Sequence, residues 1–429
     1  MATKTRVVTW NGLRVLCLLI TMSSVPVYDV AIIGGGAVGC AIVHELTGRG
    51  LKTVLCEQNS QLVQEASAGN SGIVHTGFDA TPSTIEHQCL EDARILNKTI
   101  YNKYNLPFEE RGALLVAWNQ DQMSKLPSLL KSAHNNGVTG ARLISRADLL
   151  RREPHLNPAA LGAMIIPGEL VVDPWLIPIT LAHKAWMQGS MIMRDCKVLG
   201  GHLETGSHWL LETSRGPIKS RVVINCTGLQ GDLVEAINQP SPFEIHPRKG
   251  QFAVFDQSAA NLLHSIILPV PTERTKGVLV FPSVYGNIVV GPTAEDQTAR
   301  ENPQVHPKVI DELVAYAHFV LPQLAEHPVV ATYAGLRPAT QTKDYHFIVD
   351  RDRGWVTVGG IRSTGLSACL AIARRVANAI PTSKPHITYP EQRPEIRRIA
   401  DDTVEMDGVS YHLTHPLIRL GFPNKMAKL

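Results

Sequence analysis

Clustered cysteines, long apolar runs and a charge of one sign are all missing from this sequence. Its seven cysteines are scattered along 429 residues, and none forms a Cys-x-x-Cys pair. Zinc and iron–sulfur sites need clustered ligands, and disulfide frameworks use cysteines in regular pairs. We therefore predict no metal site, and we expect buried thiols in a reducing compartment.

The charge is nearly balanced, with 41 lysines and arginines against 38 acidic residues and a net charge of +3. Nucleic-acid-binding proteins carry a much stronger basic excess, so no nucleic-acid partner is expected. The slight excess is compatible with a small anionic substrate. With 44% hydrophobic and 18% charged residues, the composition is that of a globular protein long enough for two domains.

Residues 13–22 are apolar, but the run is short and contains Arg14. A membrane-spanning helix needs about 20 apolar residues, so we expect no integral membrane segment. The run resembles the hydrophobic part of a secretory signal, although the cleavage site after it is poorly formed. We favour an unstructured leader over residues 1–26.

What the sequence does contain is a glycine-rich turn between a strand and a helix. Residues 29–33 form a short apolar run, Gly34, Gly36 and Gly39 follow, and residues 40–49 have the pattern of a helix. A second strand at residues 52–56 ends at Glu57. This is the Gly-x-Gly-x-x-Gly dinucleotide fingerprint, with an acidic residue about 20 positions after the glycines.

Each residue of the fingerprint has a physical task. Gly34 allows the tight turn, Gly36 lets a diphosphate approach the backbone, and Gly39 allows the helix to pack closely on the strand. The start of the helix offers N–H donors and a positive dipole end to the phosphates. Glu57 would accept hydrogen bonds from a ribose. Ala37 and Val38 lie in the same turn and belong to the predicted cofactor site.

Three further segments surround this turn in the predicted fold. Small residues at 67–72 suit a backbone that runs along a large flat ligand, and His75 follows them. Residues 222–228 predict a second buried parallel strand that ends in a small-residue turn. Residues 355–366 predict a strand that runs into a glycine-containing loop, with a helix after it at 367–379.

The remaining segments predict a second domain. Residues 245–293 have the proline- and glycine-punctuated pattern of antiparallel strands. Outside this β-rich segment, strands are also expected at 191–194 and 208–213, where they frame a hairpin region, and at 329–336. The fold class is therefore α/β, with a doubly wound nucleotide-binding domain and an inserted domain built on a large antiparallel sheet.

The fingerprint at 34–57, residues 70–79, residues 225–228 and residues 359–366 together resemble one family. It is the FAD-dependent amino-acid-oxidase-like group, which includes glycerol-3-phosphate dehydrogenases and oxidases and L-2-hydroxyglutarate dehydrogenases. Within the group, residues 75–79, 276–280 and 335–338 look most like the flavin-dependent glycerol-3-phosphate enzymes. The resemblance covers residues 28–380.

The resemblance implies FAD as cofactor and a Rossmann-like FAD-binding domain made of residues 27–80, 145–235 and 330–380. Residues 81–144 and 236–329 would form the substrate domain, and residues 381–429 a peripheral tail. A helix that begins near Ser367 would point its positive end at the flavin's N1 and O2. Beyond the turn and Glu57, the implied cofactor residues are Asn70, Ser71, Gly72, Thr227, Gly228, Gly360, Ile361, Gly365 and Leu366.

The resemblance also implies a catalytic group. An alcohol that is oxidised by flavin must lose its hydroxyl proton, and His75 fits the position of the general base. Arg337 is expected to act with it by gripping the anionic part of the substrate in a two-pronged way. Lys276 matches the second phosphate-binding cation, and Ser363 or Thr364 would add a hydrogen bond. Arg362 and Lys249 rank lower as spare cations.

We therefore expect an FAD-dependent oxidoreductase that acts on a CH–OH group. The leading hypothesis is oxidation of sn-glycerol 3-phosphate to dihydroxyacetone phosphate by hydride transfer to flavin, with molecular oxygen favoured over another electron acceptor such as a quinone. The first alternative is an L-2-hydroxyglutarate or other L-2-hydroxyacid enzyme of the same family. An amine or amino-acid oxidase ranks third. An alternative of another class is a flavin-binding protein without turnover.

The chain ends in Ala427-Lys428-Leu429, which resembles the Ser-Lys-Leu peroxisomal address. We therefore expect recognition by a peroxisomal import receptor, with a cytoplasmic or mitochondrial location as the alternative. A peroxisomal location conflicts with a secretory leader, and the cysteine pattern favours the peroxisome.

Overall fold

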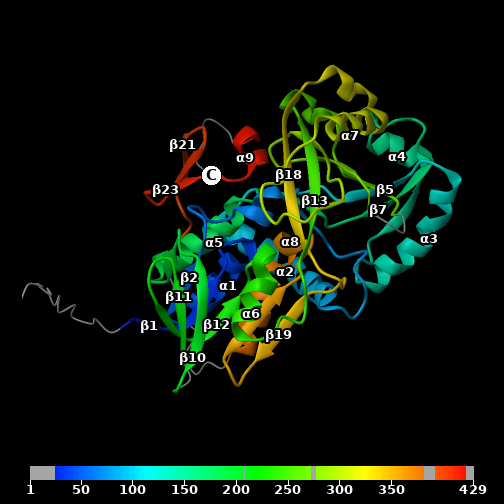
Figure 1. The fold of residues 1–429 in the computed structure, drawn as a ribbon. Helices are drawn as coiled ribbons and strands as arrows, with labels where there is room; N and C mark the ends of the chain where they lie inside the picture. Colours follow the sequence, from blue (N-terminus) through cyan, green and yellow to red (C-terminus); the bar gives the residue numbers. More distant parts are fainter. Residues whose placement is uncertain (1–24, 207, 272–276, 381–391, 422–429) are drawn as a thin grey trace, which may run out of the picture.

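The computed structural model describes residues 25–206, 208–271, 277–380 and 392–421. The expected leader therefore lies almost entirely outside the described residues, as do Lys276 and Ala427-Lys428-Leu429. Within the described part of the chain, no helix is long and apolar enough to cross a membrane. Figure 1 shows two large sheets, with β1, β2, β11 and β12 in one and β5, β7, β13 and β18 in the other.

The first large sheet has eight strands around a parallel centre. Its strand order is β10-β11-β12-β1-β2-β9, and β20 and β19 continue from β12. The pairs β12–β1, β1–β2, β2–β9 and β12–β20 are parallel, as expected for buried apolar strands joined by helical crossovers. The strands are β1 (Val27–Ile33), β2 (Thr53–Cys56), β9 (Met191–Met193), β10 (Val198–Glu204), β11 (His208–Thr213), β12 (Ile218–Asn225), β19 (His346–Asp350) and β20 (Trp355–Gly359).

Both faces of this sheet are buried, as a doubly wound fold requires. Val30 and Ile32 of β1 point into a core that includes residues of α1 (Ala37–Gly48), α2 (Ile85–Tyr104), α5 (Leu176–Met187) and α8 (Gly365–Ala379). Ala31 and Ile33 point to the opposite face, where Trp209 is buried and α6 (Gly231–Asn238) packs. The alternation of side chains along a strand explains the two cores.

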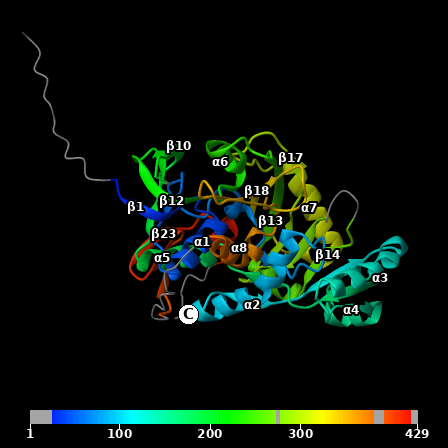
Figure 2. The same ribbon diagram turned by 90° about the horizontal axis from the view of Figure 1, so that it is seen from below.

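The second large sheet has nine strands, and its pairs are antiparallel except for β5–β14. Helix α3 (Gln120–Asn135) packs on one face, and α4 (Arg146–Arg152) and α7 (Pro307–Val320) pack on the other. Figure 2 shows α3 and α4 at the end of the molecule far from β1. The strands are β5 (Ala113–Ala117), β6 (Arg142–Ser145), β7 (Gly162–Ile166), β13 (His246–Phe255), β14 (Ile266–Pro269), β15 (Leu279–Pro282), β16 (Ile288–Gly291), β17 (Glu295–Asp296) and β18 (Val329–Ala339).

Two three-stranded sheets complete the described fold. The first joins β3 (Ile73–Val74), β8 (Leu170–Val172) and β4 (Phe108–Glu110). The second joins β21 (Ile396–Ala400), β22 (Thr403–Met406) and β23 (Val409–His412), and α9 (Pro416–Gly421) follows it. In the first of these sheets, β3, which ends the loop after β2, pairs with β8, the strand that follows β7 in the sequence.

The α/β class, the parallel sheet and the large antiparallel sheet are confirmed, but several details differ from expectation. The expected FAD-domain ranges 145–235 and 330–380 include β7 and β18, which the hydrogen bonding places in the nine-stranded sheet. The sequence analysis missed β10, which is the hairpin partner of the strand at 208–213. The other expected strand of that region, β9, pairs with β2 instead. The expectation that the C-terminal residues form a peripheral tail does not hold for residues 396–420, because their apolar side chains enter the main core.

The close contact between α1 and the glycine turn can be tested by substitution. An alanine Cβ at Gly39 would lie 1.9 Å from the Gly34 carbonyl oxygen, so Gly39→Ala must displace backbone. We expect it to lower the free energy of unfolding in urea by roughly 1–3 kcal/mol. The control is Gly48→Ala in the same helix, where a Cβ meets no atom within 4 Å. The control should gain about 0.5–1 kcal/mol, and equal stability of both variants would contradict the contact.

Candidate functional site

A cavity of about 820 Å³ is lined by residues from both large sheets. Its wall includes the glycine turn after β1, the end of β12, the loop before α8 and one face of β13 and β18. The predicted site residues that line it are Gly34, Gly36, Ala37, Val38, Glu57, Asn70, Ser71, His75, Thr227, Gly228, Arg337, Gly360, Ile361, Ser363, Thr364, Gly365 and Leu366. Segments that are far apart in the sequence thus meet around one space.

The glycine turn has the geometry that a diphosphate needs. Gly34 has φ +110°, and a Cβ there would lie 2.7 Å from the Cys226 carbonyl oxygen, so only glycine fits. Gly36 approaches Ser67, whose Oγ accepts a hydrogen bond from the Ala37 N–H at 3.0 Å. The start of α1 lies at the cavity wall, where Gly36, Ala37 and Val38 line the space, as in an anion site at a helix start.

Gly39 and Gly72 line the protein interior, not the cavity. Gly39 allows α1 to approach the turn, which is the packing task predicted for it. Gly72 has φ +70°, and a Cβ there would lie 3.0 Å from the Val172 carbonyl oxygen. Gly72 therefore lets its loop pack on β8, while its neighbours Asn70 and Ser71 reach the cavity.

Glu57 stands at the end of β2 and ties the glycine turn in place. Its carboxylate is buried, and Oε2 accepts a hydrogen bond from the Gly35 N–H at 2.7 Å. Oε1 accepts from the Asn59 N–H at 2.8 Å. Burial raises the pKa of Glu57, and these two backbone donors oppose the rise. Each oxygen has a second lone pair, so the carboxylate can still accept from a ribose at the cavity wall.

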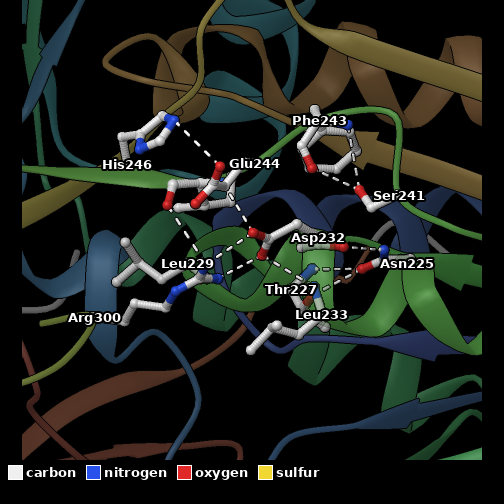
Figure 3. Close-up of polar contacts among 12 residues, drawn as sticks. Asn225, Thr227, Leu229, Asp232, Leu233, Ser241, Phe243, Glu244, His246 and Arg300 are labelled. Atoms are coloured by element: carbon white, nitrogen blue, oxygen red, sulfur yellow. Dashed lines mark hydrogen bonds and ion pairs between the residues drawn. The ribbon is translucent and has the colours of Figure 1, made fainter. Parts of the chain in front are cut away.

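The end of β12 is stabilised by a network of side chains, which Figure 3 shows. Asn225 Oδ1 accepts a hydrogen bond from Thr227 Oγ1 at 2.8 Å, and Asn225 Nδ2 donates to the Gly231 carbonyl at 2.8 Å. Arg300 makes a two-pronged ion pair with Asp232 of α6 (Figure 3). The network holds Thr227 and Gly228 at the cavity wall.

The loop before α8 forms another part of the wall. Gly360 has φ +68°, and α8 begins at Gly365, two residues earlier than predicted. The positive end of α8 is therefore at the cavity, as expected for stabilising negative charge on a ligand. Ser363 is exposed there, whereas Thr364 is buried and its hydroxyl donates to Glu86 Oε1 at 2.6 Å.

His75 is paired with Glu169, a residue that the sequence analysis missed. The Glu169 carboxylate is fully buried, and its Oε2 lies 2.9 Å from His75 Nδ1. Its Oε1 accepts from the Thr76 N–H and hydroxyl, both at 2.7 Å. A carboxylate accepts hydrogen bonds, so we assign the imidazole proton to Nδ1. The sequence signal that could have identified Glu169 is its position directly before the apolar strand β8.

Arg337 lies inside β18, not after the end of its strand as predicted. Its guanidinium donates to the Thr293 carbonyl at 3.1 Å and fits beside Gly250, where a Cβ would lie 2.6 Å from Nη2. Burial and, to a smaller extent, the positive charge of Arg248 together lower the pKa of Arg337 to about 10.

Arg248 is the second functional residue that the sequence analysis missed. The strand register places it directly opposite Arg337, so both side chains share one face of the sheet. Both arginines line the cavity, and among the described residues the ion-pair contact of Arg248 is a long one, 3.7 Å between its Nε and Asp296 Oδ1. Two neighbouring cations at a cavity wall form a site for an anion.

The other expected cations differ in position. Lys249 points away from the cavity and forms an ion pair with Glu295 at 3.2 Å, so it is structural. Arg362 lines the cavity and donates to the Lys343 carbonyl at 2.9 Å. Lys276 is not among the described residues, although Gly277 after it lines the cavity. No cluster of metal-ligating side chains occurs among the residues described.

The comparisons with known proteins agree with this geometry. Residues 29–379 match the model of the family described as FAD dependent oxidoreductase. A glycerol 3-phosphate dehydrogenase of Caloramator mitchellensis is 28% identical over 382 residues, which are 88% of this chain and 79% of the relative. A glycerol 3-phosphate oxidase of Mycoplasma pneumoniae is 30% identical over 371 residues, which are 83% of this chain and 96% of the relative.

Solved structures and a second group of relatives also match. The L-alpha-glycerophosphate oxidase of Mycoplasma pneumoniae with FAD bound has a TM-score of 0.80 and 28% identity, over 85% of this chain and 97% of that one. An L-2-hydroxyglutarate dehydrogenase of Indibacter alkaliphilus is 28% identical over 274 residues, which are 62% of this chain and 68% of the relative. The family match spans most of the chain, and the protein belongs to the FAD dependent oxidoreductase family, with FAD as its cofactor.

Proposed function

We propose that the protein oxidises sn-glycerol 3-phosphate to dihydroxyacetone phosphate, with molecular oxygen as the electron acceptor. The observation that carries the proposal is one cavity lined by His75, whose imidazole is paired with the buried carboxylate of Glu169 behind it, and by two neighbouring arginines. The imidazole of His75 suits proton transfer from a hydroxyl group, and the two arginines suit a doubly charged anion. The relatives named glycerol 3-phosphate oxidase support both the substrate and the acceptor.

His75 is the proposed general base. Because Nδ1 faces the buried carboxylate of Glu169, Nε2 is the ring nitrogen that takes the proton of the substrate hydroxyl. The negative charge of Glu169 stabilises the imidazolium that results, and its two bonds from Thr76 keep it in position. FAD, when bound, supplies the acceptor for the two electrons that leave the carbon atom.

Arg337 and Arg248 are proposed to bind the phosphate. Like charges directly opposite each other on neighbouring strands destabilise the sheet, so the pair needs an anion between them. A phosphate monoester carries a charge of about −1.5 to −2 at neutral pH and three acceptor oxygens, whereas a carboxylate carries one charge. Ser363, at the same cavity, can donate a further hydrogen bond.

The second candidate is an L-2-hydroxyacid enzyme, which the match to L-2-hydroxyglutarate dehydrogenases supports. In that case the two arginines would bind a carboxylate, and His75 would keep the same task. We also propose a peroxisomal location, which is supported by the terminal Ala427-Lys428-Leu429 and by the unpatterned cysteines.

The substrate can be identified by bleaching of the flavin without oxygen. We expect sn-glycerol 3-phosphate to bleach the oxidised flavin of the purified holoenzyme, and L-2-hydroxyglutarate and sarcosine to leave it unchanged. The measurement is the absorbance of oxidised flavin after anaerobic mixing. Bleaching by the hydroxyacid alone would replace the proposal with the second candidate, and bleaching by none would remove turnover on all three compounds.

The imidazole–carboxylate pair can be tested with His75→Ala and Glu169→Gln. A glutamine at 169 would donate to Nδ1 and leave the proton on Nε2, the wrong tautomer for a base. We expect each variant to slow anaerobic flavin reduction by roughly 10²–10⁴-fold while FAD stays bound. Stopped-flow absorbance measures the rate.

The control for this test is Glu153→Gln. Glu153 is also a fully buried carboxylate near a histidine, His264, at 3.4 Å, but neither lines the cavity. We expect the rate of flavin reduction in Glu153→Gln to equal that of the unmodified enzyme. Glu169→Asp should recover part of the lost rate because it restores an acceptor. Normal reduction in Glu169→Gln would show that the pair has no part in the proton transfer.

The two arginines can be tested by measuring the Kd for glycerol 3-phosphate from flavin spectra. We expect Arg337→Ala to raise the Kd by roughly 10²-fold, and the more exposed Arg248→Ala by about tenfold. The control is Arg142→Ala, an exposed arginine of the same sheet that does not line the cavity. An unchanged Kd in Arg248→Ala would assign the phosphate to other cations.

A further inference from the structure

Residues 396–420, here called the C-terminal strap, lie beyond the family match, which ends at residue 379. They comprise β21, β22, β23 and most of α9, and Figure 1 shows them beside α5 and the upper part of β18. The strap is firmly packed: its buried apolar side chains join the core that includes α1, α5 and α8, and they are Ile396, Val404, Met406, Leu413 and Ile418.

A polar anchor fastens the strap to α5. His183 of α5 is buried, and its Nδ1 lies 2.8 Å from the hydroxyl of Tyr411 in β23. Its Nε2 lies 3.0 Å from Asp407 Oδ2, and the Lys184 ammonium lies 3.4 Å from the same oxygen. This anchor sets where the residues after β23 meet the rest of the protein.

Those next residues reach the loop at positions 63–70, which leads to the cavity. The hydroxyl of Thr414 donates to the Val63 carbonyl at 2.6 Å, and His415 Nε2 donates to the Asn70 carbonyl at 3.1 Å. His415 is fully buried, and burial lowers its pKa to about 3, so the ring is neutral and Nε2 carries the proton. The strap therefore holds both ends of this loop.

The loop needs such support because its backbone is strained. Val63 has φ 57° and Glu65 has φ 51°, in the left-handed region. That conformation is unfavourable for any residue except glycine, and most of all for a β-branched one such as Val63. Strained residues keep their conformation only when the surrounding structure holds them.

The same loop supports the glycine turn. The Val63 N–H donates to the Gly35 carbonyl at 2.9 Å, and Ser67 Oγ accepts from the Ala37 N–H at 3.0 Å. Asn70 reaches the cavity itself. A continuous path of hydrogen bonds thus runs from the strap through the loop to the backbone that faces a dinucleotide's diphosphate.

We propose that the C-terminal strap is a cofactor-retaining element and that Thr414 and His415 are its positioning residues. They hold the strained loop against the glycine turn, and FAD leaves slowly only while the loop is held. The strap thus adds to the family domain a part of the cofactor site that the family match does not include. The proposal depends on FAD binding and is independent of which substrate the enzyme uses.

The test is the rate at which FAD leaves the full-length holoenzyme. Released flavin is followed by its fluorescence after dilution, below the unfolding temperature. We expect Thr414→Val to raise the dissociation rate by about tenfold, because it removes a donor to the part-buried Val63 carbonyl. His415→Leu should raise the rate by a smaller factor, about threefold to fivefold, because the Asn70 carbonyl keeps the Tyr333 hydroxyl as a donor at 3.0 Å. Thr414→Ser and His415→Gln keep a donor and should stay within about twofold of the unmodified enzyme.

The control is His412→Leu, which replaces an exposed histidine of the same strap that contacts Asp402. Its dissociation rate should not change. The melting temperature of the FAD-free protein, measured for every variant, separates retention from folding. An unchanged dissociation rate in Thr414→Val and His415→Leu overturns the proposal. It is equally overturned if His412→Leu accelerates release to the same extent, or if the serine and glutamine variants do not recover slow release.

Discussion

The contact between α1 and the carbonyl of Gly34 is the constraint on which the rest of the structure depends. Because Gly39 has no side chain, the helix can start directly above the turn, and its first residues reach the cavity wall. Glu57, just after β2, accepts a hydrogen bond from the Gly35 N–H, and Val63 in the following loop donates one to the Gly35 carbonyl. This end of the cavity is thus organised by closely packed backbone groups, which leave no room for a side chain at Gly34 or Gly39.

The end of the cavity where we propose that substrate binds is built differently, from side chains that two other sheets present. The register of β13 and β18 places Arg248 opposite Arg337, and Gly250 leaves space for the buried guanidinium. The small sheet β3-β8-β4 brings Glu169 to His75. The buried carboxylate of Glu169 is compensated by its hydrogen-bond partners, whereas the two arginines place like charges opposite each other. The proposed substrate anion would offset the cost of the arginine pair, and stability would then be linked to substrate binding.

The C-terminal strap links the main hydrophobic core to the loop that supports the glycine turn. Its apolar residues complete the core beneath the parallel sheet, and its polar residues reach the loop that supports the glycine turn. Strain at Val63 and Glu65 is therefore balanced by a segment that follows the whole cofactor domain in the sequence. Under the proposed role of the strap, the family domain and this added segment would form one cofactor site together.

The sequence by itself determined the glycine turn, the parallel strands and the position of Glu57, because all of these belong to one local strand–helix–strand unit. It also predicted His75 and Arg337 through resemblance. Only the tertiary structure decided their partners, since Glu169 is 94 residues from His75 and meets it through sheet pairing. Likewise, strand register decided that Arg248 faces Arg337, and packing brought His415 to Asn70 across 345 residues. Local patterns carry no information about such distant pairs, because the pairs depend on how separate elements pack.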